Sequence, residues 1–256
     1  MSQMADVQAQ HQALELVRTP AGGLLVRGMV GFRIDYEGTS IEDSYEIEVV
    51  VPEEYPRVPP TARETDGDIP DNYHHKFLSN GMLCLGAPIE VKRAFAEHRT
   101  LLSFIDRQVI PYLFSHSCFQ RFGRFPYGEL RHGIQGVLDY YSEHFGTSIL
   151  ATMRLLKYLA DYEFPQGDQC PCGSYRELCM CHGRKVLELW GHQSSQEFAA
   201  DLIQIIMLYA VLTNPLDEAW WALDDLLPKR YPSLLEFWSA NKAGQVEAQE
   251  DQRESA

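Results

Sequence analysis

Two neighbouring stretches near the start of the chain carry most of its alternation between hydrophobic and polar positions. Residues 24–36 are rich in Val, Met, Phe and Ile, and a turn at Glu37-Gly38-Thr39 leads into the second stretch. There the apolar residues alternate with glutamates, in the order Tyr45, Glu46, Ile47, Glu48, Val49 and Val51. A period of two is that of an antiparallel strand with one buried and one solvated face. The pattern predicts a meander that stops at Pro52 and at the proline-rich run 55–60, because proline donates no hydrogen bond to a sheet.

Elsewhere the apolar residues recur at helical spacing. A short helix is expected over residues 8–17, before Thr19-Pro20, and another begins at Thr100 and ends or kinks at Pro111. Further helices are expected from Tyr127-Gly128-Glu129 to Phe145, after Ser148, from a capping box at Ser194 and Glu197 to Leu212, and between Trp220 and Trp238. Together with the meander, these helices predict an α+β protein.

Composition divides the chain into three parts. Gly146-Thr147-Ser148 predicts a boundary between residues 1–147, a meander sheet packed with helices, and residues 148–240, a smaller and mostly helical region. Residues 241–256 are polar, acidic and poor in aromatic residues, so we expect a disordered tail. A length of 256 residues with 45% hydrophobic content allows one or two globular cores.

Charge and hydropathy exclude two classes of partner at this stage. A net charge of −14 opposes binding to nucleic acid, because phosphate backbones are bound through clustered Lys and Arg. The N-terminus has no signal-peptide pattern, and the longest apolar run, 202–212, is shorter than the ~20 residues that cross a bilayer. We therefore expect a cytoplasmic protein that does not enter a membrane.

Four of the six cysteines lie between Cys170 and Cys181. In a cytoplasmic chain such density indicates metal binding before disulfides. Two cysteines one residue apart can bind a metal from a single turn, and an adjacent Cys-His pair completes a tetrahedral set that suits zinc. The predicted ligands are Cys170, Cys172, Cys181 and His182, with Cys179 as a substitute for one of them. Because four protein ligands leave no place for water, the predicted zinc is structural.

Cys84 stands apart from this cluster, after an Asn80-Gly81 turn. An isolated cysteine is either a small buried hydrophobe, which is our interpretation of Cys118, or a nucleophile that must ionise to react. Cationic side chains near Cys84 in the sequence could favour its thiolate: His74, His75, Lys76, Lys92 and Arg93.

The order of motifs from Tyr55 to Leu85 resembles the ubiquitin-conjugating enzymes. A Tyr-Pro-x-x-Pro-Pro run at Tyr55–Pro60, a histidine at His74 and a short turn before Cys84-Leu85 match that family at its spacing. The resemblance covers roughly the first 145 residues and implies a UBC-like fold, with Cys84 as the nucleophile and His74 bracing its loop by hydrogen bonding.

One family feature is missing. The family's Pro and Asn after the histidine are His75 and Lys76 here, as in prokaryotic members that keep the cysteine and often lack the tripeptide. In the family the asparagine steadies the oxyanion, so we expect either another donor in that role, Asn80 or a backbone N–H, or a slow enzyme. The region from Cys170 to His182 is similar to the SEC-C motif of the SecA translocase, which implies a zinc ligand set of Cys170, Cys172, Cys181 and His182.

The resemblance implies a conjugating enzyme. An activating enzyme would pass the C-terminal glycine of a ubiquitin-like protein to Cys84, and the thioester would then be attacked by a lysine amine or another nucleophile on a target protein. Prokaryotic relatives commonly sit in antiphage operons, so an operon partner is an expected target. Two alternatives remain open: an inert UBC-like binding module in which the cysteine is incidental, and a zinc adaptor whose function lies after Ser148.

Overall fold

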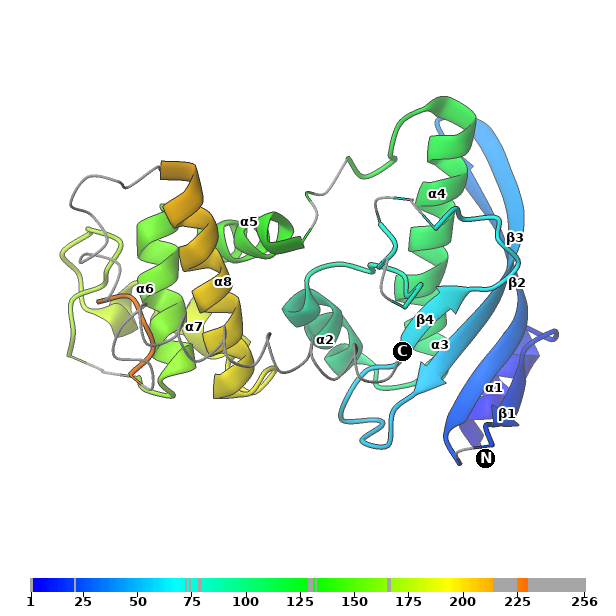
Figure 1. The fold of residues 1–256 in the computed structure, drawn as a ribbon, viewed down its shortest axis with the longest axis horizontal. Coiled ribbons are helices and arrows are strands. Elements are labelled where there is room, and N and C mark those ends of the chain that lie inside the picture. Colours follow the sequence, from blue (N-terminus) through cyan, green and yellow to red (C-terminus); the bar gives the residue numbers. More distant parts are fainter. Residues whose placement is uncertain are drawn as a thin grey trace, which may run out of the picture. The chain divides into compact units, whose positions relative to one another are not determined.

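The computed structural model describes residues 2–20, 22–71, 73, 75–77, 80–128, 131, 133–164, 167–213 and 225–229. The chain forms two compact units, residues 1–136 and 137–256, and the protein is α+β (Figure 1). The first unit contains a four-stranded antiparallel sheet with helices, and the named elements of the second unit are helices. This division falls earlier in the chain than the boundary expected after Thr147.

The predicted meander is confirmed. The sheet has the order β1 (Glu15–Arg18), β2 (Leu24–Tyr36), β3 (Thr39–Val51) and β4 (Thr61–Glu64), and each strand pairs antiparallel with the next. β2 turns into β3 through Glu37 and Gly38, which both have positive φ, the geometry of a tight two-residue hairpin. β3 stops at Val51, directly before Pro52, and β4 begins directly after Pro60.

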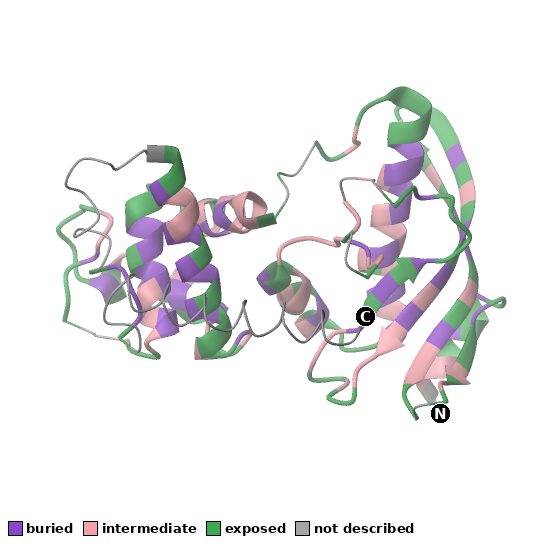
Figure 2. Cartoon of the chain, in the orientation of Figure 1, coloured by how far each residue is buried: buried purple, intermediate pink, exposed green. Residues whose placement is uncertain are grey.

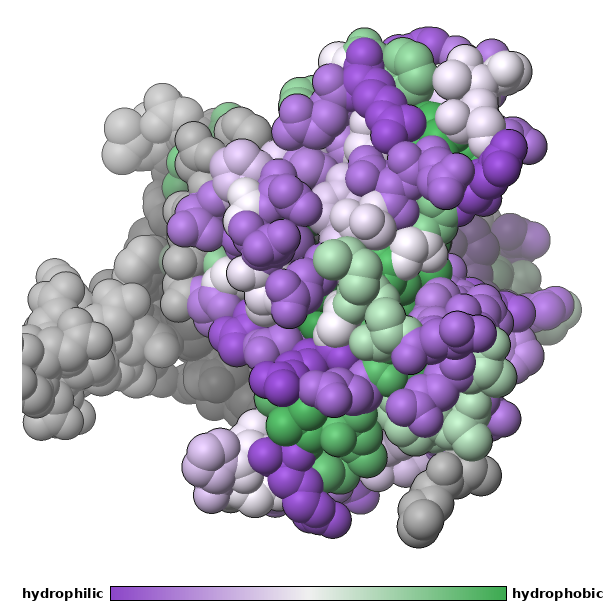
Figure 3. Space-filling model, turned by 90° about the vertical axis from the view of Figure 1, so that its right-hand side faces the viewer, coloured by the Kyte–Doolittle hydropathy of each residue, from purple (hydrophilic) through white to green (hydrophobic). Residues whose placement is uncertain are grey.

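Burial alternates along β2 and β3 as the sequence predicts (Figure 2). Val26, Val30, Ile47 and Val49 are fully buried, whereas Glu46, which alternates with them on β3, is exposed and Glu48 is partly exposed. Figure 3 views the molecule from the side on which the sheet lies in Figure 1 and shows a mostly hydrophilic surface with small hydrophobic patches. The sheet therefore has one dry face and one wet face.

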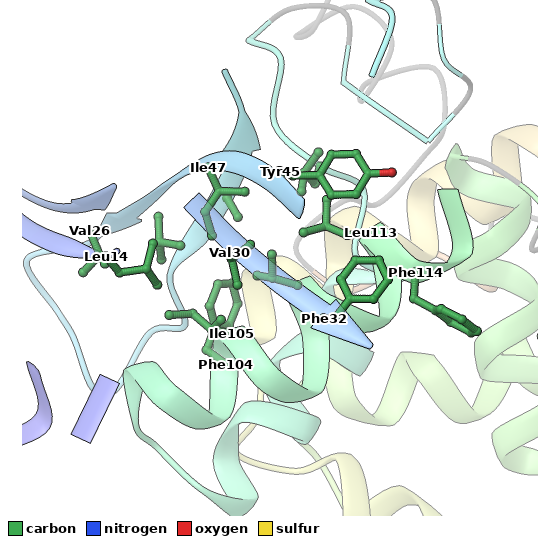
Figure 4. Close-up of a cluster of buried hydrophobic side chains, with 14 of the residues drawn as sticks. Leu14, Val26, Val30, Phe32, Tyr45, Ile47, Phe104, Ile105, Leu113 and Phe114 are labelled. Atoms are coloured by element: carbon green, nitrogen blue, oxygen red, sulfur yellow. The ribbon is translucent and has the colours of Figure 1, made fainter. Parts of the chain in front are cut away.

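Helices cover the dry face and complete the core of the first unit. α3 (Leu101–Phe104), a π-helical turn η1 (Ile105–Val109) and α4 (Ile110–Phe122) form one continuous helical run, and α4 packs on β2 and β3. Figure 4 shows Phe104 and Ile105 of this run beside residues of β2 and β3 in a single apolar cluster. The remaining helices of the unit are α1 (Ser2–Gln10) and α2 (Pro88–Glu97).

The helix expected over residues 8–17 is wrong. The N-terminal helix α1 ends at Gln10, and Glu15–Arg18 pairs instead with Leu24–Arg27 as strand β1. In so short a segment Leu14, Leu16 and Val17 fit a strand as well as a helix, and the turn between Thr19 and Gly23 allows the pairing. Sheet pairing therefore overrides the local helical pattern.

Pro111 does not end its helix. It lies at the second residue of α4, immediately after the π-helical turn, and the helical run continues through it although proline offers no N–H donor. An end at Pro111 is therefore wrong, and the structure shows a change of helical type directly before this residue.

The second unit is built on the pairing of α6 (Ile149–Ala160) with α8 (Ser195–Thr213), and α7 (Gly183–Leu189) packs on α6. α5 (Gly133–Phe145) begins later than expected and buries Leu138, Tyr141 and Phe145. The capping box of α8 is confirmed, because the backbone N–H of Glu197 donates to Ser194 Oγ while that of Ser194 donates to Glu197 Oε2. The aromatic positions 220, 221, 237 and 238 and the tail 241–256 lie outside the described residues.

By length and composition alone, α8 is long and apolar enough to cross a membrane. The helix is nineteen residues long and therefore extends beyond the apolar run found in the sequence. Leu202, Ile205 and Ile206 of α8 are fully buried in the second unit. Core helices share these properties with membrane spans, so α8 is weak support for a membrane segment.

Candidate active site and candidate metal centre

Cys84 follows a small hairpin that lies along β4. Within this hairpin the N–H of Phe77 donates to the Met82 carbonyl at 2.8 Å, and the N–H of Gly81 donates to the Phe77 carbonyl at 2.8 Å. The N–H of Leu83 donates to Ala62 of β4, and the N–H of Cys84 donates to the carbonyl of His75, both at 2.8 Å. The cysteine backbone is therefore fixed on both sides by main-chain hydrogen bonds.

The Cys84 side chain lines a pocket of about 410 Å³ within the first unit. Three groups of residues form part of its walls. Tyr73, His75 and Leu85 come from the loops on either side of Cys84, and Glu90, Val91 and Ala94 come from α2. Phe125, Tyr127 and Gly128 come from the loop that follows α4. The helical run contributes Arg107, Gln108, Pro111, Tyr112 and Ser115 to the lining. The volume lies within the range of small-ligand sites, about 300–1,000 Å³.

Burial dominates the electrostatics of the Cys84 thiol. Desolvation raises its pKa above the ordinary value, a hydrogen bond from the Gly86 backbone opposes this effect, and the charge of Glu90 adds to it. At neutral pH the sulfur is therefore mainly a thiol. A reaction partner that supplies positive charge or a hydrogen bond to the sulfur would increase its nucleophilicity.

Of the side chains singled out near Cys84, His75 is brought to the pocket, with its ring centroid 5.2 Å from that of Phe125. Asn80 instead closes its own turn, since its Oδ1 accepts the N–H of Met82 at 3.1 Å, and it does not line the pocket. His74 lies outside the described residues, so its bracing role stays a prediction.

Lys76, which stands where the resembled family has asparagine, is tied into the loop that precedes Cys84. Its ammonium donates to the carbonyl of Ile69 at 3.0 Å and to Asp71 at 2.9 Å, and only 6% of its side chain is exposed. It does not line the pocket, and neither do Lys92 and Arg93 of α2. The Lys76 side chain therefore holds the loop and is not a solvated surface group.

The loop that binds Lys76 is itself organised by Glu64. This carboxylate is 5% exposed and accepts the backbone N–H groups of four successive residues, Asp66 to Ile69, at 2.6–3.2 Å. Charged acceptors make the stronger protein hydrogen bonds. Glu64 thus connects the end of β4 to the segment that carries His75.

A buried polar network contacts the ring of Tyr73. His116 Nδ1 is 3.0 Å from the hydroxyl of Tyr45, which is 2.7 Å from Ser117 Oγ, and Ser117 donates to Asp43. Burial lowers the pKa of His116, so the ring is neutral at neutral pH, and its centroid is 5.0 Å from that of Tyr73. Sequence reasoning placed Tyr45 only in the apolar core and missed this network.

Sequence reasoning also missed the helical wall of the pocket. Gln108, Tyr112 and Ser115 recur at helical spacing, but their polar character alone identifies no ligand site. Gln108 Oε1 is buried without a hydrogen-bond partner among the described residues, and Tyr112 donates its hydroxyl hydrogen to the carbonyl of His75 at 2.9 Å. The burial predicted for Cys118 is confirmed.

The second unit brings the four predicted metal ligands together. The ligand atoms of Cys170, Cys172, Cys181 and His182 all lie within 4.8 Å of one another. Cys172 Sγ is 3.6 Å from Cys181 Sγ, and His182 Nδ1 is 3.2 Å from the sulfurs of both Cys170 and Cys181. Three thiols and an imidazole at such separations could bind a metal ion.

Groups around the cluster orient these ligands. His182 Nε2 is 3.0 Å from the carbonyl of Phe145, which makes Nε2 the donor and leaves Nδ1 free to accept a metal. Arg176 donates to Cys181 Sγ at 3.3 Å. A hydrogen bond from Ser174 lowers the pKa of Cys172 to about 6, whereas burial raises that of Cys170. Cys179 is exposed, with its sulfur 3.6 Å from Glu177 Oε2, and is not part of the cluster.

Comparisons with known proteins add no family. No family model matches the sequence, and no curated protein and no solved structure matches it either. The function must therefore be argued from the residues and the geometry of this chain.

Proposed function

We propose that the protein carries a ubiquitin-like modifier as a thioester on Cys84 and transfers it to a target protein. The observation that carries the proposal is the position of Cys84, a half-buried cysteine on the wall of a ligand-sized pocket. The motif order from Tyr55 to Leu85 resembles that of the ubiquitin-conjugating enzymes, and this resemblance supports a nucleophilic role for Cys84. An N-terminal helix and a four-stranded meander before the cysteine are compatible with a UBC-like fold.

The proposed reaction has two acyl transfers. In the first, the Cys84 thiolate attacks the thioester carbonyl carbon of the modifier's C-terminal residue, a new C–S bond forms, and the thiolate of the activating enzyme leaves. In the second, a target amine attacks the same carbon, an amide bond forms, Cys84 leaves as a thiolate, and the amine gives up a proton. His75 and Glu90 line the same pocket as Cys84 and are the candidates to accept that proton.

A second candidate function is an inert binding module on the same fold. Two observations favour it: the pKa of Cys84 is raised, and the Asn80 side chain is engaged in its own turn. In that case the pocket would bind a peptide or small ligand, and Cys84 would be part of its apolar wall.

For the second unit we propose a structural zinc ion bound by Cys170, Cys172, Cys181 and His182, in a motif similar to SEC-C. Ideal tetrahedral zinc places sulfurs roughly 3.8 Å apart and sulfur and nitrogen roughly 3.6 Å apart, from bond lengths of about 2.3 and 2.0–2.1 Å. The observed separations of 3.6 and 3.2 Å need only a small expansion. Such a site stabilises a segment with few helical turns of its own.

The test of the conjugating function is co-expression of the tagged protein with the products of its neighbouring genes, followed by non-reducing gels and intact-mass measurement. Wild type is expected to form a thiol-sensitive adduct that Cys84→Ala lacks. Cys84→Ser is expected to keep a thiol-resistant ester. Cys179→Ser is the matched control, because Cys179 is an exposed cysteine outside the pocket.

The same experiment separates the alternatives. If the activating enzyme charges itself and no adduct forms on wild type, the conjugating function is rejected. Retention of full cellular activity by a folded Cys84→Ala variant would then favour the binding module. An adaptor that acts only through the second unit would lose all activity when the residues after Thr147 are deleted, whereas an enzyme would still charge Cys84.

A further inference from the structure

We propose that His75 and Cys84 form a catalytic pair, in which the imidazole accepts the thiol proton as Cys84 attacks an acyl donor. Because the pair assigns a base to the nucleophile of the proposed acyl transfer, it rests on that function. It requires of the donor only an activated carbonyl group, which a thioester that ends in glycine provides. The observation that carries the pair is the register of the hairpin before Cys84.

The hairpin places His75 directly opposite Cys84. Lys76 pairs with Leu83 across an antiparallel bridge, and the positions one step further out must then pair as well. These positions are His75 and Cys84, and the N–H of Cys84 donates to the carbonyl of His75 at 2.8 Å. Residues directly opposite in an antiparallel pair have side chains on one face, with Cβ atoms roughly 5 Å apart. The imidazole and the thiol are therefore cross-strand neighbours.

The two faces of the hairpin agree with this arrangement. On one face, His75 and Cys84 both line the pocket. On the other face, Leu83 belongs to the apolar core and Lys76 donates to the Ile69 carbonyl, and neither lines the pocket. Such alternation from one pair to the next is the pattern of an antiparallel ladder. The pairing thus brings a basic nitrogen and a nucleophilic sulfur into one cavity.

The imidazole of His75 is held in place by its neighbours. Its ring centroid is 5.2 Å from that of Phe125, at an interplanar angle of 79°, and 5.6 Å from that of Tyr73. The main chain of His75 is held as well, because the Tyr112 hydroxyl donates to its carbonyl at 2.9 Å. A base that is fixed beside its nucleophile gains the rate advantage of a preset orientation.

Histidine is the pocket-lining residue type that ordinarily changes its charge between about pH 5 and 8. Glutamate is a much weaker base, with an ordinary pKa of about 4.3 against about 6.5 for histidine. The charge of Glu90 also raises the pKa of Cys84 and so opposes formation of the thiolate. An imidazole that takes up the proton places a positive charge beside the new thiolate, which offsets the effect of burial. His75 is therefore the better base for Cys84.

The proton follows a closed cycle in this reaction. As the C–S bond forms between Cys84 and the acyl carbon, the thiol proton moves to an imidazole nitrogen of His75. The bond from the same carbon to the thiol of the donor breaks, and the departing thiolate takes up the proton from the imidazolium. His75 is then neutral again before the target amine arrives.

Acylation rates measured against pH test the pair. The full chain is mixed with the acetyl-Ala-Gly thioester of mercaptopropionate, and acylation is followed by intact mass, with the signal of Cys84→Ala subtracted. Without a base, the thiolate fraction rises about tenfold per pH unit below the pKa of the thiol. Base-assisted attack levels off once histidine is neutral, above about pH 7. From about pH 7 to 8 the wild-type rate is therefore expected to rise less than about threefold.

His75→Gln removes the base and is expected to lower the rate at about pH 7 by tenfold or more. Its rate should then rise about tenfold from pH 7 to 8, so the two profiles converge in alkali, where the thiol is ionised without help. A loss through altered structure would instead lower the rate by one factor at every pH. His98→Gln is the matched control and should keep the wild-type profile, because His98 is an exposed histidine at the end of α2, outside the pocket.

Iodoacetamide separates failure of the pair from failure of the acyl transfer, because it alkylates a thiol without any acyl chemistry. If the thioester never acylates Cys84 but alkylation shows the same dependence on His75 and pH, the pair stands and the acyl transfer is overturned. If wild type is acylated at a rate that rises about tenfold per pH unit, the acyl transfer stands and the pair is overturned. Parallel profiles for wild type and His75→Gln would overturn the pair in the same way.

Discussion

The two units present cysteine in opposite settings. In the first unit a single sulfur lies on an apolar wall, and burial and Glu90 raise its pKa. In the second unit three sulfurs and an imidazole lie within 4.8 Å of one another, and Ser174 and Arg176 donate hydrogen bonds among them. The first setting keeps a thiol protonated until a partner arrives, whereas in the second a hydrogen bond favours the Cys172 thiolate, and a bound metal ion would displace the remaining thiol protons to solvent.

The supporting structure differs as well. The loop of Cys84 is held by backbone hydrogen bonds to β4, by the Lys76 ammonium and by the carboxylate of Glu64. The segment from Gln169 to His182 contains only one 3₁₀ turn, η2 (Leu178–Met180), and a single bridge that pairs Gln169 with Glu177. The site in the first unit is therefore supported by its fold, whereas the segment in the second unit has little regular structure around its candidate metal ligands.

Removal of one metal ligand should produce the largest effect. Cys181→Ser is expected to abolish binding of one metal ion and to unfold the segment from Asp168 to Leu189, because metal binding contributes on the order of 10–16 kcal/mol in zinc-dependent peptides. Metal content by mass spectrometry of the native protein and hydrogen exchange of the second unit measure the two effects. Exchange in the sheet of the first unit serves as the internal control. A variant that still binds one equivalent of zinc with unchanged exchange would contradict the assignment.

Loss of the Glu64 charge should be the next largest effect. The two carboxylate oxygens of Glu64 together accept four backbone N–H groups, and Glu64→Gln replaces one of these oxygens with an NH2 group that can only donate. The variant is expected to lower the free energy of unfolding by about 2–3 kcal/mol. Urea denaturation measures the change. Glu48→Gln is the matched control, because Glu48 lies on the same sheet in a partly exposed ion pair with Arg63, worth about 0–1 kcal/mol. Equal losses of unfolding free energy in the two variants would show that the buried carboxylate of Glu64 stabilises the protein no more than the partly exposed one of Glu48.

A smaller effect concerns the reactivity of Cys84. Because the negative charge of Glu90 raises the pKa of the thiol, Glu90→Gln is expected to lower this pKa and to move the alkylation rate profile toward lower pH. At pH 8 the rate constant with iodoacetamide should rise about two- to fivefold, and burial should still keep the midpoint above that of a free thiol.

Glu97→Gln provides the control for this measurement. Glu97 is on the same helix, α2, but does not line the pocket, so its variant should leave the profile unchanged. A Glu90→Gln profile that coincides with wild type would show that the carboxylate does not act on the sulfur.

Elements whose signal is local were predictable from the sequence. The alternation at Tyr45 to Val51 specified a strand with a wet face, and the Ser194–Glu197 spacing specified a helix start. The four candidate metal ligands could be named because they are close in sequence, and the structure brings all four together. In these cases the interacting groups are separated by a few residues, so spacing constrains geometry.

Features that depend on distant segments were not predictable. β1 exists because Glu15–Arg18 pairs with β2, and its own residues fit a helix equally well. The pocket needs the Cys84 loop, α2 and the helical run together, and Gln108 and Tyr112 carry no mark of that role in the sequence. The side chain of Asn80 is directed by its own turn, which no motif match specifies.

The smallest expected effect is that of Cys179. Sequence spacing left it open as a substitute ligand, but its side chain is exposed and its sulfur is 3.6 Å from a carboxylate oxygen of Glu177. Cys179→Ser should therefore keep one bound metal ion and change the free energy of unfolding by less than about 0.5 kcal/mol, as surface substitutions do. Metal titration of Cys179→Ser beside Cys181→Ser measures this difference directly. If Cys179→Ser lost the ion and Cys181→Ser kept it, the ligand set would have to exchange one cysteine for the other.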